Sequence, residues 1–184
     1  MELQGERLIP APIEKTWAAL NDPEALKVCI AGCESLERTG DDKFAALVAV
    51  KVGPVSARFK GNLEMTNVQP PNSYTINFDG QGGPAGFGKG SADVSLTPEG
   101  GQTRLKYVAR AQVGGRMAQV GSRLIDAAAA KIAEDFFKAF EANLQAKSAG
   151  EPAVQAPAAT IGSNRLWWMV GAAGLLAALY FLSL

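Results

Sequence analysis

The clearest pattern in the chain is an alternation of small or apolar residues with polar residues over positions 55–66. The first set comprises Val55, Ala57, Phe59, Gly61, Leu63 and Met65, and a polar residue follows each of them. This period of two predicts a strand with one solvated face. Segments of similar pattern at 43–51, 74–79, 89–97 and 104–113 are separated by turns rich in Gly and Pro. The sequence therefore predicts an antiparallel meander of five strands, with a further edge strand at about 2–9.

Helical patterns lie on both sides of the meander. Pro12 suits the first turn of a short helix with Trp17 and Leu20 on its apolar side, and Asn21-Asp22-Pro23 ends that helix and begins a second. From Arg116 to about Lys147, apolar residues recur at steps of three or four, which predicts one long amphipathic helix. The expected fold class is α+β, with a curved antiparallel sheet wrapping a long C-terminal helix.

The residues expected to face inward suggest a cavity between sheet and helix. Gly61, Gly90, Ala92, Ala109 and Ala111 would face the small residues at 127–130. Small side chains on both surfaces imply either a close approach of the two layers or a gap. We infer a gap suited to an apolar ligand, because a strongly curved sheet cannot follow a straight helix along its whole length. A tightly packed core is the alternative.

The aromatic and large aliphatic residues on the inward face are the candidate cavity lining, although each could equally be ordinary core. An inward Tyr107 hydroxyl would need a hydrogen-bond partner, which a ligand carbonyl could supply. The full set of predicted ligand-binding residues is Phe59, Leu63, Tyr74, Phe78, Phe87, Tyr107, Met117 and Leu124.

The end of the sequence has the composition of a membrane span. No charged residue follows Arg165, and the segment from Leu166 to Leu184 would span about 28 Å as a helix, against a hydrocarbon core of about 30 Å. Trp167 and Trp168 lie at one end and Tyr180 near the other, where amphipathic rings favour the headgroup zones. We predict a single-pass C-terminal transmembrane helix at 165–184.

This segment sets the expected domain organisation and location. Residues 148–164 hold two Pro, several Ala and one charge, a composition typical of a flexible linker, and residues 1–147 form the folded domain. Almost nothing follows the predicted span, so the domain is expected to stay on the side where it is made, the cytoplasmic side of the cell (inner) membrane, and Arg165 beside the span agrees with this orientation.

Composition excludes several kinds of function. The net charge is zero, which argues against nucleic acid as a partner, and the absence of His removes the usual general base and metal ligand. Cys29 and Cys33 cannot complete a zinc site alone, and reduced, partly buried thiols are the simplest interpretation, with a redox or interface role as the alternative. No carboxylate, Lys or His falls on a confident inward position. We therefore expect no catalytic residue, no metal site and no enzymatic activity.

Two further features have ordinary explanations. The spacing of Gly83, Gly88 and Lys89 is similar to a phosphate-binding loop, but Gly90 stands where Ser or Thr is needed and a strand pattern follows. A Gly-rich bend, or a mobile gate with Phe87 at its tip, fits better. The outward charges Arg58, Lys60, Arg104, Lys106 and Arg110 are either the solvated face of the sheet or a docking surface.

Several longer runs resemble a known family. The segments LNDPEAL, CIAGCESLE, KVGPVSARFKG, GFGKGSADVSLTPEGGQTRLKY and AQVGGRMAQVGSRLIDAAAAKIAEDFF look like the G-subunit family of carbon monoxide dehydrogenase, over about residues 1–145. That family belongs to the START-like, or polyketide-cyclase-like, helix-grip superfamily. It usually has Pro-Gly between the two cysteines, where this chain has Ala31-Gly32.

The resemblance implies an accessory protein rather than a catalytic subunit. Such proteins are associated with molybdenum-containing carbon monoxide dehydrogenase and related hydroxylases, which they are thought to recruit to the membrane, and they are thought to handle quinone. The expected partners are thus a molybdenum hydroxylase, the lipid bilayer through Leu166, Trp167, Trp168, Tyr180 and Leu184, and a quinone-like molecule bound without a covalent link. A recruitment factor with no ligand and a general carrier of lipids or other apolar molecules are the alternatives.

Overall fold

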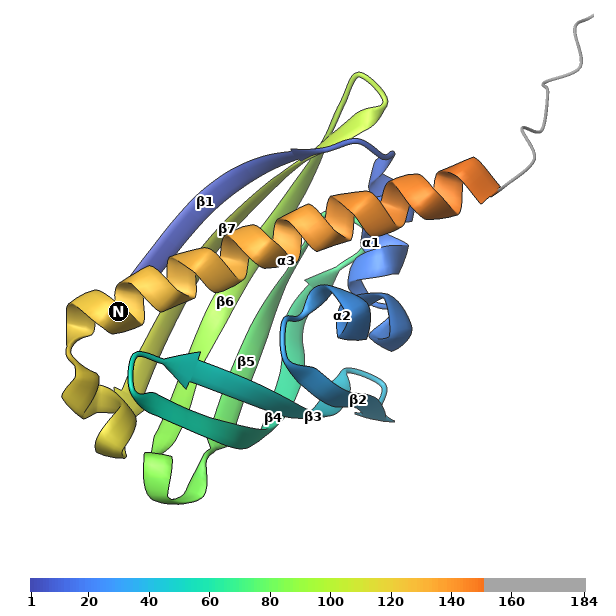
Figure 1. Ribbon diagram of the computed structural model, residues 1–184. Helices are drawn as coiled ribbons and strands as arrows, with labels where there is room; N and C mark the ends of the chain where they lie inside the picture. The colour runs from blue at the N-terminus through green and yellow to red at the C-terminus, as the bar shows by residue number, and fades with distance from the viewer. Residues whose placement is uncertain (151–184) are drawn as a thin grey trace, which may run out of the picture. The chain divides into compact units, whose positions relative to one another are not determined.

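The computed structural model describes residues 1–150, with side chains to 147 (Figure 1). The chain divides into two units, Met1–Glu151 and Pro152–Leu184. Residues 148–150, expected at the start of the linker, are instead the end of a helix. The rest of the predicted linker, 151–164, and the predicted membrane span at 165–184 lie outside the described residues. Within the described part, no helix has both the length and the apolar character that a bilayer crossing requires.

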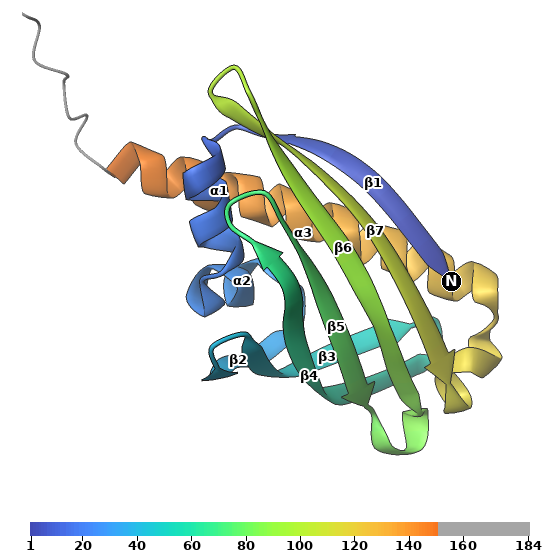
Figure 2. The ribbon, with the colours of Figure 1, turned by 180° about the vertical axis from the view of Figure 1, so that it is seen from behind.

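Seven antiparallel strands form one sheet in the order β1-β7-β6-β5-β4-β3-β2. Figure 2 shows the long strands β4 to β7 from the face opposite α3, where their strong curvature is visible. The strands are β1 (Glu2–Ile9), β2 (Cys33–Gly40), β3 (Lys43–Val52), β4 (Val55–Gln69), β5 (Ser73–Gln81), β6 (Phe87–Glu99) and β7 (Gln102–Gly114). Six of them are the expected edge strand and five-strand meander.

The helices lie on the inner face and at the ends of the sheet. They are α1 (Ile13–Leu20), α2 (Pro23–Cys29), α3 (Ser122–Gly150) and the short 3-10 helices η1 (Gly83–Ala85) and η2 (Gly115–Val120). Asp22 caps α2 by accepting a hydrogen bond from the Glu24 N–H at 3.0 Å, and Pro23 occupies the first turn. The sheet curves around α3, and the fold is helix-grip-like, as the element order predicted (Figure 1).

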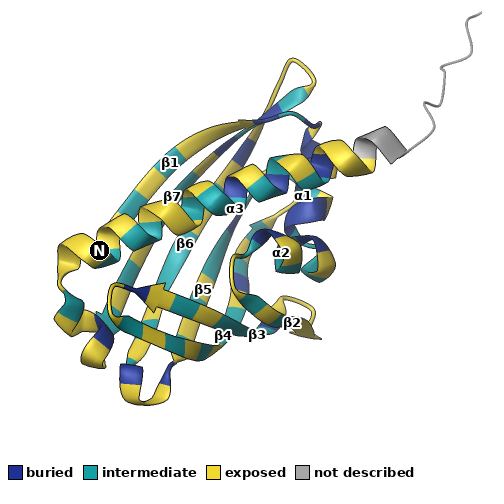
Figure 3. Ribbon diagram, viewed as in Figure 1, coloured by how far each residue is buried: buried dark blue, intermediate teal, exposed yellow. Residues whose placement is uncertain are grey.

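The two halves of α3 differ in how they are packed. Phe137, Phe140 and Leu144 are buried against the sheet and α2. From Ser122 to Ile132, by contrast, every side chain is exposed or half-buried (Figure 3). The C-terminal half of α3 is therefore anchored in the core, and the N-terminal half spans the sheet without filling the space beneath it.

The predicted start of the long helix is wrong. Residues 115–120 form the 3-10 helix η2, Gly121 follows with φ +93°, and α3 begins only at Ser122. A φ of this sign is unfavourable for any residue with a side chain, so Gly121 permits the break. The 3-10 period of three and the α period of 3.6 place apolar residues similarly over one or two turns, which is why the pattern appeared continuous.

Strand β2 was missed because its pattern is weak. Only Leu36 is buried along Cys33–Gly40, and the remaining side chains are exposed or half-buried. The preceding loop contacts β3: the Ala49 N–H donates to the Gly32 carbonyl at 2.8 Å, and Gly32 has φ +77°. Gly32 lies so close to the Ala49 backbone that a side chain would overlap it, so the glycine of the Ala31-Gly32 pair allows the loop to approach the sheet.

Candidate ligand-binding site

A cavity of about 420 Å³ lies between the sheet and α3, within the size range of small-molecule sites. On the sheet side its lining includes Ala92 and Ala109, which are paired across β6 and β7. On the helix side it includes Ala129 and Ala133. Four alanines thus face one another where larger side chains would have filled the space, and the predicted gap between the layers is present.

The prediction that Gly61, Gly90 and Ala111 face this gap is wrong, since none of the three lines the cavity. The ring of Phe78 lies against Gly90, its register partner on β6, and a Cβ at Gly90 would stand 2.8 Å from Phe78 Cζ. The Phe78 ring therefore occupies the space that a side chain at Gly90 would take, and the open volume lies over Ala92 and Ala109 instead.

Three of the predicted ligand-binding residues, Leu63, Tyr74 and Tyr107, line this cavity together. Tyr74 is 4% exposed, and its ring meets that of Trp17 edge-on with the ring centroids 5.5 Å apart. Its hydroxyl makes no hydrogen bond to another described residue, and burial raises its pKa. Tyr74 therefore keeps its proton at every physiological pH and can donate to a ligand.

Tyr107 lines the cavity next to the edge strand. Its ring packs beside Phe137, with centroids 5.3 Å apart, and lies over Gly5 of the edge strand β1. A Cβ at Gly5 would stand 2.5 Å from the Tyr107 hydroxyl oxygen. This hydroxyl therefore lies beside the edge strand, and Tyr74 is the more deeply buried donor of the pair.

The other predicted residues, like Phe78, lie outside this cavity. Phe59 packs against Gly82, and Phe87 packs against Gly114 and is 39% exposed. Met117 in η2 is buried, whereas Leu124 is 48% exposed and approaches Gly53 in the β3–β4 turn. The structure thus places three of the eight predicted residues in the cavity and the other five elsewhere, on β4, β5, β6, η2 and the first turn of α3.

Several lining residues were not predicted from the sequence. Leu20 comes from α1, Leu26 from α2, Ile30 from the residue after α2, and Leu36 from β2. Phe136 and Phe137 come from α3. The spacing of Leu26 and Ile30 was an available signal for an apolar helix face. Their position at the cavity depends on how α2 packs on the end of the sheet, which periodicity does not show.

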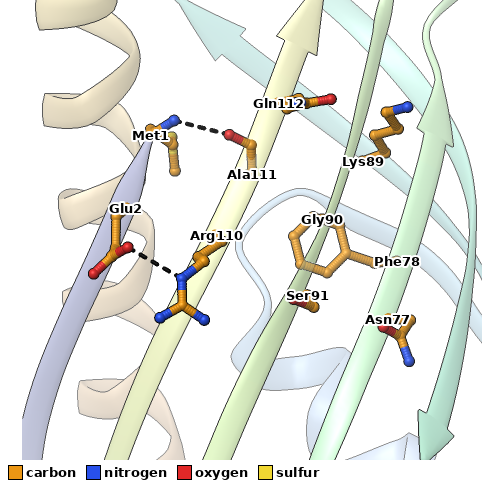
Figure 4. A pocket seen from close by; sticks show the side chains of 10 residues that line it. All are labelled: Met1, Glu2, Asn77, Phe78, Lys89, Gly90, Ser91, Arg110, Ala111 and Gln112. Atoms are coloured by element: carbon orange, nitrogen blue, oxygen red, sulfur yellow. Dashed lines mark hydrogen bonds and ion pairs between the residues drawn. The ribbon is translucent and has the colours of Figure 1, made fainter.

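A second hollow, of about 660 Å³, lies over β5, β6 and β7 (Figure 4). Its lining is mostly polar, with Asn77, Lys89, Ser91, Arg110 and Gln112 on the outward face. Arg110 is already paired with Glu2 at 3.1 Å, and the N-terminal ammonium donates to the Ala111 carbonyl at 2.9 Å (Figure 4). These groups hold the edge strand β1 in place, so we do not treat this hollow as the candidate site.

The outward positive charges are largely neutralised within the sheet. Arg58 pairs with Glu34 at 2.7 Å, and Arg104 contacts both Glu99 and Glu6. Lys106 pairs with Glu6 at 3.5 Å, and hydrogen bonding to Arg104 holds the Glu6 pKa below its usual range. Such exposed pairs contribute little stability, but they leave a mixed surface rather than a continuous basic patch.

The thiols and the acidic residues offer no further site in the described part. Cys29 is buried, Cys33 is half-buried, and neither is in a disulfide or lines the cavity. Burial raises the pKa of both thiols, which makes them less reactive. Within residues 1–150, no group of three or more His, Cys, Asp or Glu side chains is placed to hold a metal ion.

Comparison with known proteins identifies the family. The CoxG family, described as the G subunit of carbon monoxide dehydrogenase, matches residues 5–145, which is most of the chain. The chain belongs to the CoxG family. This family is one of accessory rather than catalytic subunits, and its name associates it with carbon monoxide dehydrogenase. No curated protein matches the chain.

Solved structures share the fold of this chain. A conserved protein from Geobacillus kaustophilus is 34% identical, with a TM-score of 0.75, covering 80% of this chain and 97% of that one. A protein from Thermus thermophilus is 22% identical, with a TM-score of 0.62 and coverage of 80% and 99%. The ZhuI aromatase/cyclase from Streptomyces sp. R1128 is 12% identical, with a TM-score of 0.59 and coverage of 83% and 99%. At that identity, the cyclase shows a shared fold and nothing about activity.

Proposed function

We propose that this chain is an accessory protein that holds a quinone-like apolar molecule in the cavity under α3. We further propose that it brings a molybdenum hydroxylase of the carbon monoxide dehydrogenase type to the cell membrane. The observation that carries the proposal is the cavity itself, whose 20 lining residues are all apolar apart from the two tyrosine hydroxyls. Such a lining favours a ligand that is mostly hydrocarbon with few polar atoms.

The geometry also favours carriage over catalysis. General acid–base chemistry needs a group that can gain or lose a proton within reach of the substrate. The lining contains no carboxylate, Lys or Cys, and the buried Tyr74 has its pKa raised away from neutral pH. Residues of the described cavity can therefore bind and orient a ligand and keep water from it, and we propose no reaction step for them.

Membrane recruitment rests on the terminal segment. The 19 uncharged residues after Arg165 have the length and the aromatic ends of a bilayer span. An electron acceptor that dissolves in lipid and an enzyme that works in the cytoplasm need a meeting point at the membrane surface. A tethered domain with an apolar cavity would supply it, and this is the role we propose.

Mass spectrometry of organic extracts of the purified full-length chain tests the ligand. We expect quinone in the wild-type protein, a strong reduction in Ala129→Phe, and a wild-type amount in Ala130→Phe. Ala129 lines the cavity, whereas its neighbour Ala130 is exposed and does not, so the two changes have a similar effect on the helix and differ in the space they fill. Equal amounts of quinone in both variants would contradict the proposal. Co-extracted lipid without quinone would favour the general carrier instead.

The enzyme partner is tested separately. Affinity purification of the tagged full-length chain from its own cells, followed by protein identification, should recover the subunits of a molybdenum hydroxylase. Recovery should persist in the Ala129→Phe variant, because recruitment through the surface does not need a ligand in the cavity. Absence of any hydroxylase under conditions where the tagged protein remains in its membrane would exclude the recruitment role.

A further inference from the structure

The cavity lining contains very few hydrogen-bonding side chains. Among its lining side chains, only Tyr74 and Tyr107 carry a nitrogen or oxygen atom, so the lining offers no carboxylate and no amide. Asn143 Oδ1 is an enclosed acceptor without a partner among the described residues, but Asn143 does not line the cavity. A bound molecule therefore meets one buried phenol at Tyr74, a second phenol near the edge strand, and otherwise hydrocarbon and the weakly accepting sulfur of Met65.

The backbone groups around the cavity already form hydrogen bonds within the sheet and within α3. Ala92 and Val94 on β6 are paired with Ala109 and Tyr107 on β7, and with Ile76 and Tyr74 on β5. Carbonyl groups in the middle of a sheet are used by the ladder, and those within α3 are used by the helix. The backbone of the sheet and of α3 consequently offers a ligand no further strong hydrogen-bond acceptor.

We propose that this cavity selects the carbonyl form of its ligand over the corresponding hydroxyl form, so that a quinone binds more tightly than the quinol made from it. The inference rests on the proposed function, because it concerns the same ligand in the same cavity. A quinone that takes up two electrons and two protons becomes a quinol, and each carbonyl oxygen becomes an O–H group. The change converts two acceptors into groups that must also donate.

The physical basis lies at the oxygen that does not reach Tyr74. Either form can pair one oxygen with the Tyr74 hydroxyl, since a phenol both donates and accepts. The opposite oxygen then lies among side chains that are apolar apart from the Tyr107 phenol at the edge strand. Away from that phenol, a carbonyl leaves only acceptor sites unmatched and a hydroxyl also leaves an unmatched donor. We expect a preference for the quinone of roughly tenfold, which corresponds to the burial of one extra unsatisfied donor.

This selectivity would make the delivery of ligand to the enzyme directional. The oxidised acceptor would be held while it is presented to the enzyme, and the reduced product would leave the cavity because it binds less well. No conformational change of the protein is required, since the reaction itself alters the hydrogen-bonding groups of the ligand. The release step would therefore be linked to the reduction that the enzyme performs.

The test compares a decyl-substituted benzoquinone with its quinol, titrated anaerobically by calorimetry into the full-length chain. Ile76→Thr and Ile76→Val form a matched pair, because Thr and Val have nearly the same shape and only Thr adds an oxygen. Ile76 lines the cavity two residues from Tyr74 on the same strand face, so its variant oxygen can accept a bond from the second quinol hydroxyl. We expect the quinone preference in the wild type and in Ile76→Val, and a severalfold smaller preference in Ile76→Thr.

Equal affinities for the two forms, or tighter binding of the quinol, would overturn the inference while leaving quinone carriage intact. If neither form binds, the quinone proposal fails, and a long-chain methyl ketone and its secondary alcohol replace them as probes. Tighter binding of the ketone would then support carbonyl selection by the cavity for another ligand. Equal binding of ketone and alcohol, or no binding of either, would overturn it.

Discussion

The Tyr107 ring lies over Gly5, its register partner across β1 and β7, with the hydroxyl oxygen 2.5 Å from the position of a Cβ. Gly5→Ala should therefore displace a rigid ring and loosen the edge strand, at a cost of about 1–3 kcal/mol in the free energy of unfolding. Urea denaturation measures it. Gly88→Ala is the matched control, since a Cβ there meets nothing within 4 Å. A loss of stability as large in Gly88→Ala would show that the ring contact is not the cause.

A buried pair of hydroxyls connects α1 to β7. Thr103 Oγ1 donates to the Ala11 carbonyl at 2.7 Å, Thr16 Oγ1 donates to Thr103 Oγ1 at 3.2 Å, and both threonines are 0% exposed. Thr103→Val should destabilise the fold by about 1–3 kcal/mol, because the Ala11 carbonyl loses its shorter hydrogen bond and the Thr16 hydroxyl keeps only its longer contact with that carbonyl, at 3.4 Å. The double variant with Thr16→Val should cost less than the sum of the two single changes in chemical denaturation. Strict additivity would mean that the two hydroxyls are not coupled.

The ion pair between Lys147 and Asp22, at 3.1 Å, joins the end of the anchored half of α3 to the N-cap of α2. Burial opposes ionisation of Asp22, but hydrogen bonds from Lys147 and the Glu24 N–H outweigh it and hold the Asp22 pKa below its usual range. A lowered carboxylate pKa contributes stability above the unfolded-state pKa of about 4, and that contribution is lost as the pH falls through the folded-state pKa.

Asp22→Ala should accordingly destabilise the domain by about 1 kcal/mol at pH near 7, mostly through loss of the cap. The difference from wild type should shrink as the pH is lowered below about 4, because protonation removes the same carboxylate charge from the wild type. Denaturation midpoints measured across that pH range provide the check. A difference that stays constant with pH would assign the effect to something other than the Asp22 charge.

The two cavity phenols should differ in their effect on ligand affinity. Tyr74→Phe removes the deeply buried donor and should weaken binding of a decyl-substituted benzoquinone by roughly fivefold to tenfold, the value of one hydrogen bond. Tyr107→Phe should change affinity by less than about twofold, because that hydroxyl lies beside Gly5 at the edge strand. Calorimetric titration of both variants measures this. A larger loss of affinity in Tyr107→Phe than in Tyr74→Phe would show that Tyr107, and not Tyr74, is the main hydrogen-bond donor to the ligand.

The terminal segment should determine where the protein resides. Removal of residues 165–184 should release the chain from membranes into the soluble fraction, because no helix among residues 1–150 can cross a bilayer. Membrane flotation followed by immunoblotting checks the location, and circular dichroism of the released protein checks that the domain remains folded. Persistent flotation of a folded, truncated protein would refute the anchor.

Much of the fold follows from local patterns in the sequence. The alternation at Val55–Met65 predicted both the β4 strand and its inward face, because a period of two places one set of side chains on each side of any strand. Apolar spacing around Phe136, Phe140 and Leu144 likewise predicted the anchored half of α3. These features depend on residues close together in the chain, so the sequence alone was sufficient for them.

Features set by contacts between distant segments were decided only by the tertiary structure. The helix break at Gly121 and the strand at Cys33–Gly40 depend on how Met117 and Leu36 pack against other elements, and a local pattern contains no such information. The same holds for the cavity. The small residues in the sequence predicted either a gap or a close approach of the two layers. The presence of the gap, and its position over Ala92 and Ala109, follow from Phe78 covering Gly90 and from Phe137 and Phe140 holding one half of α3 against the sheet. Free volume is the space that packing leaves between layers, and only the assembled layers define it.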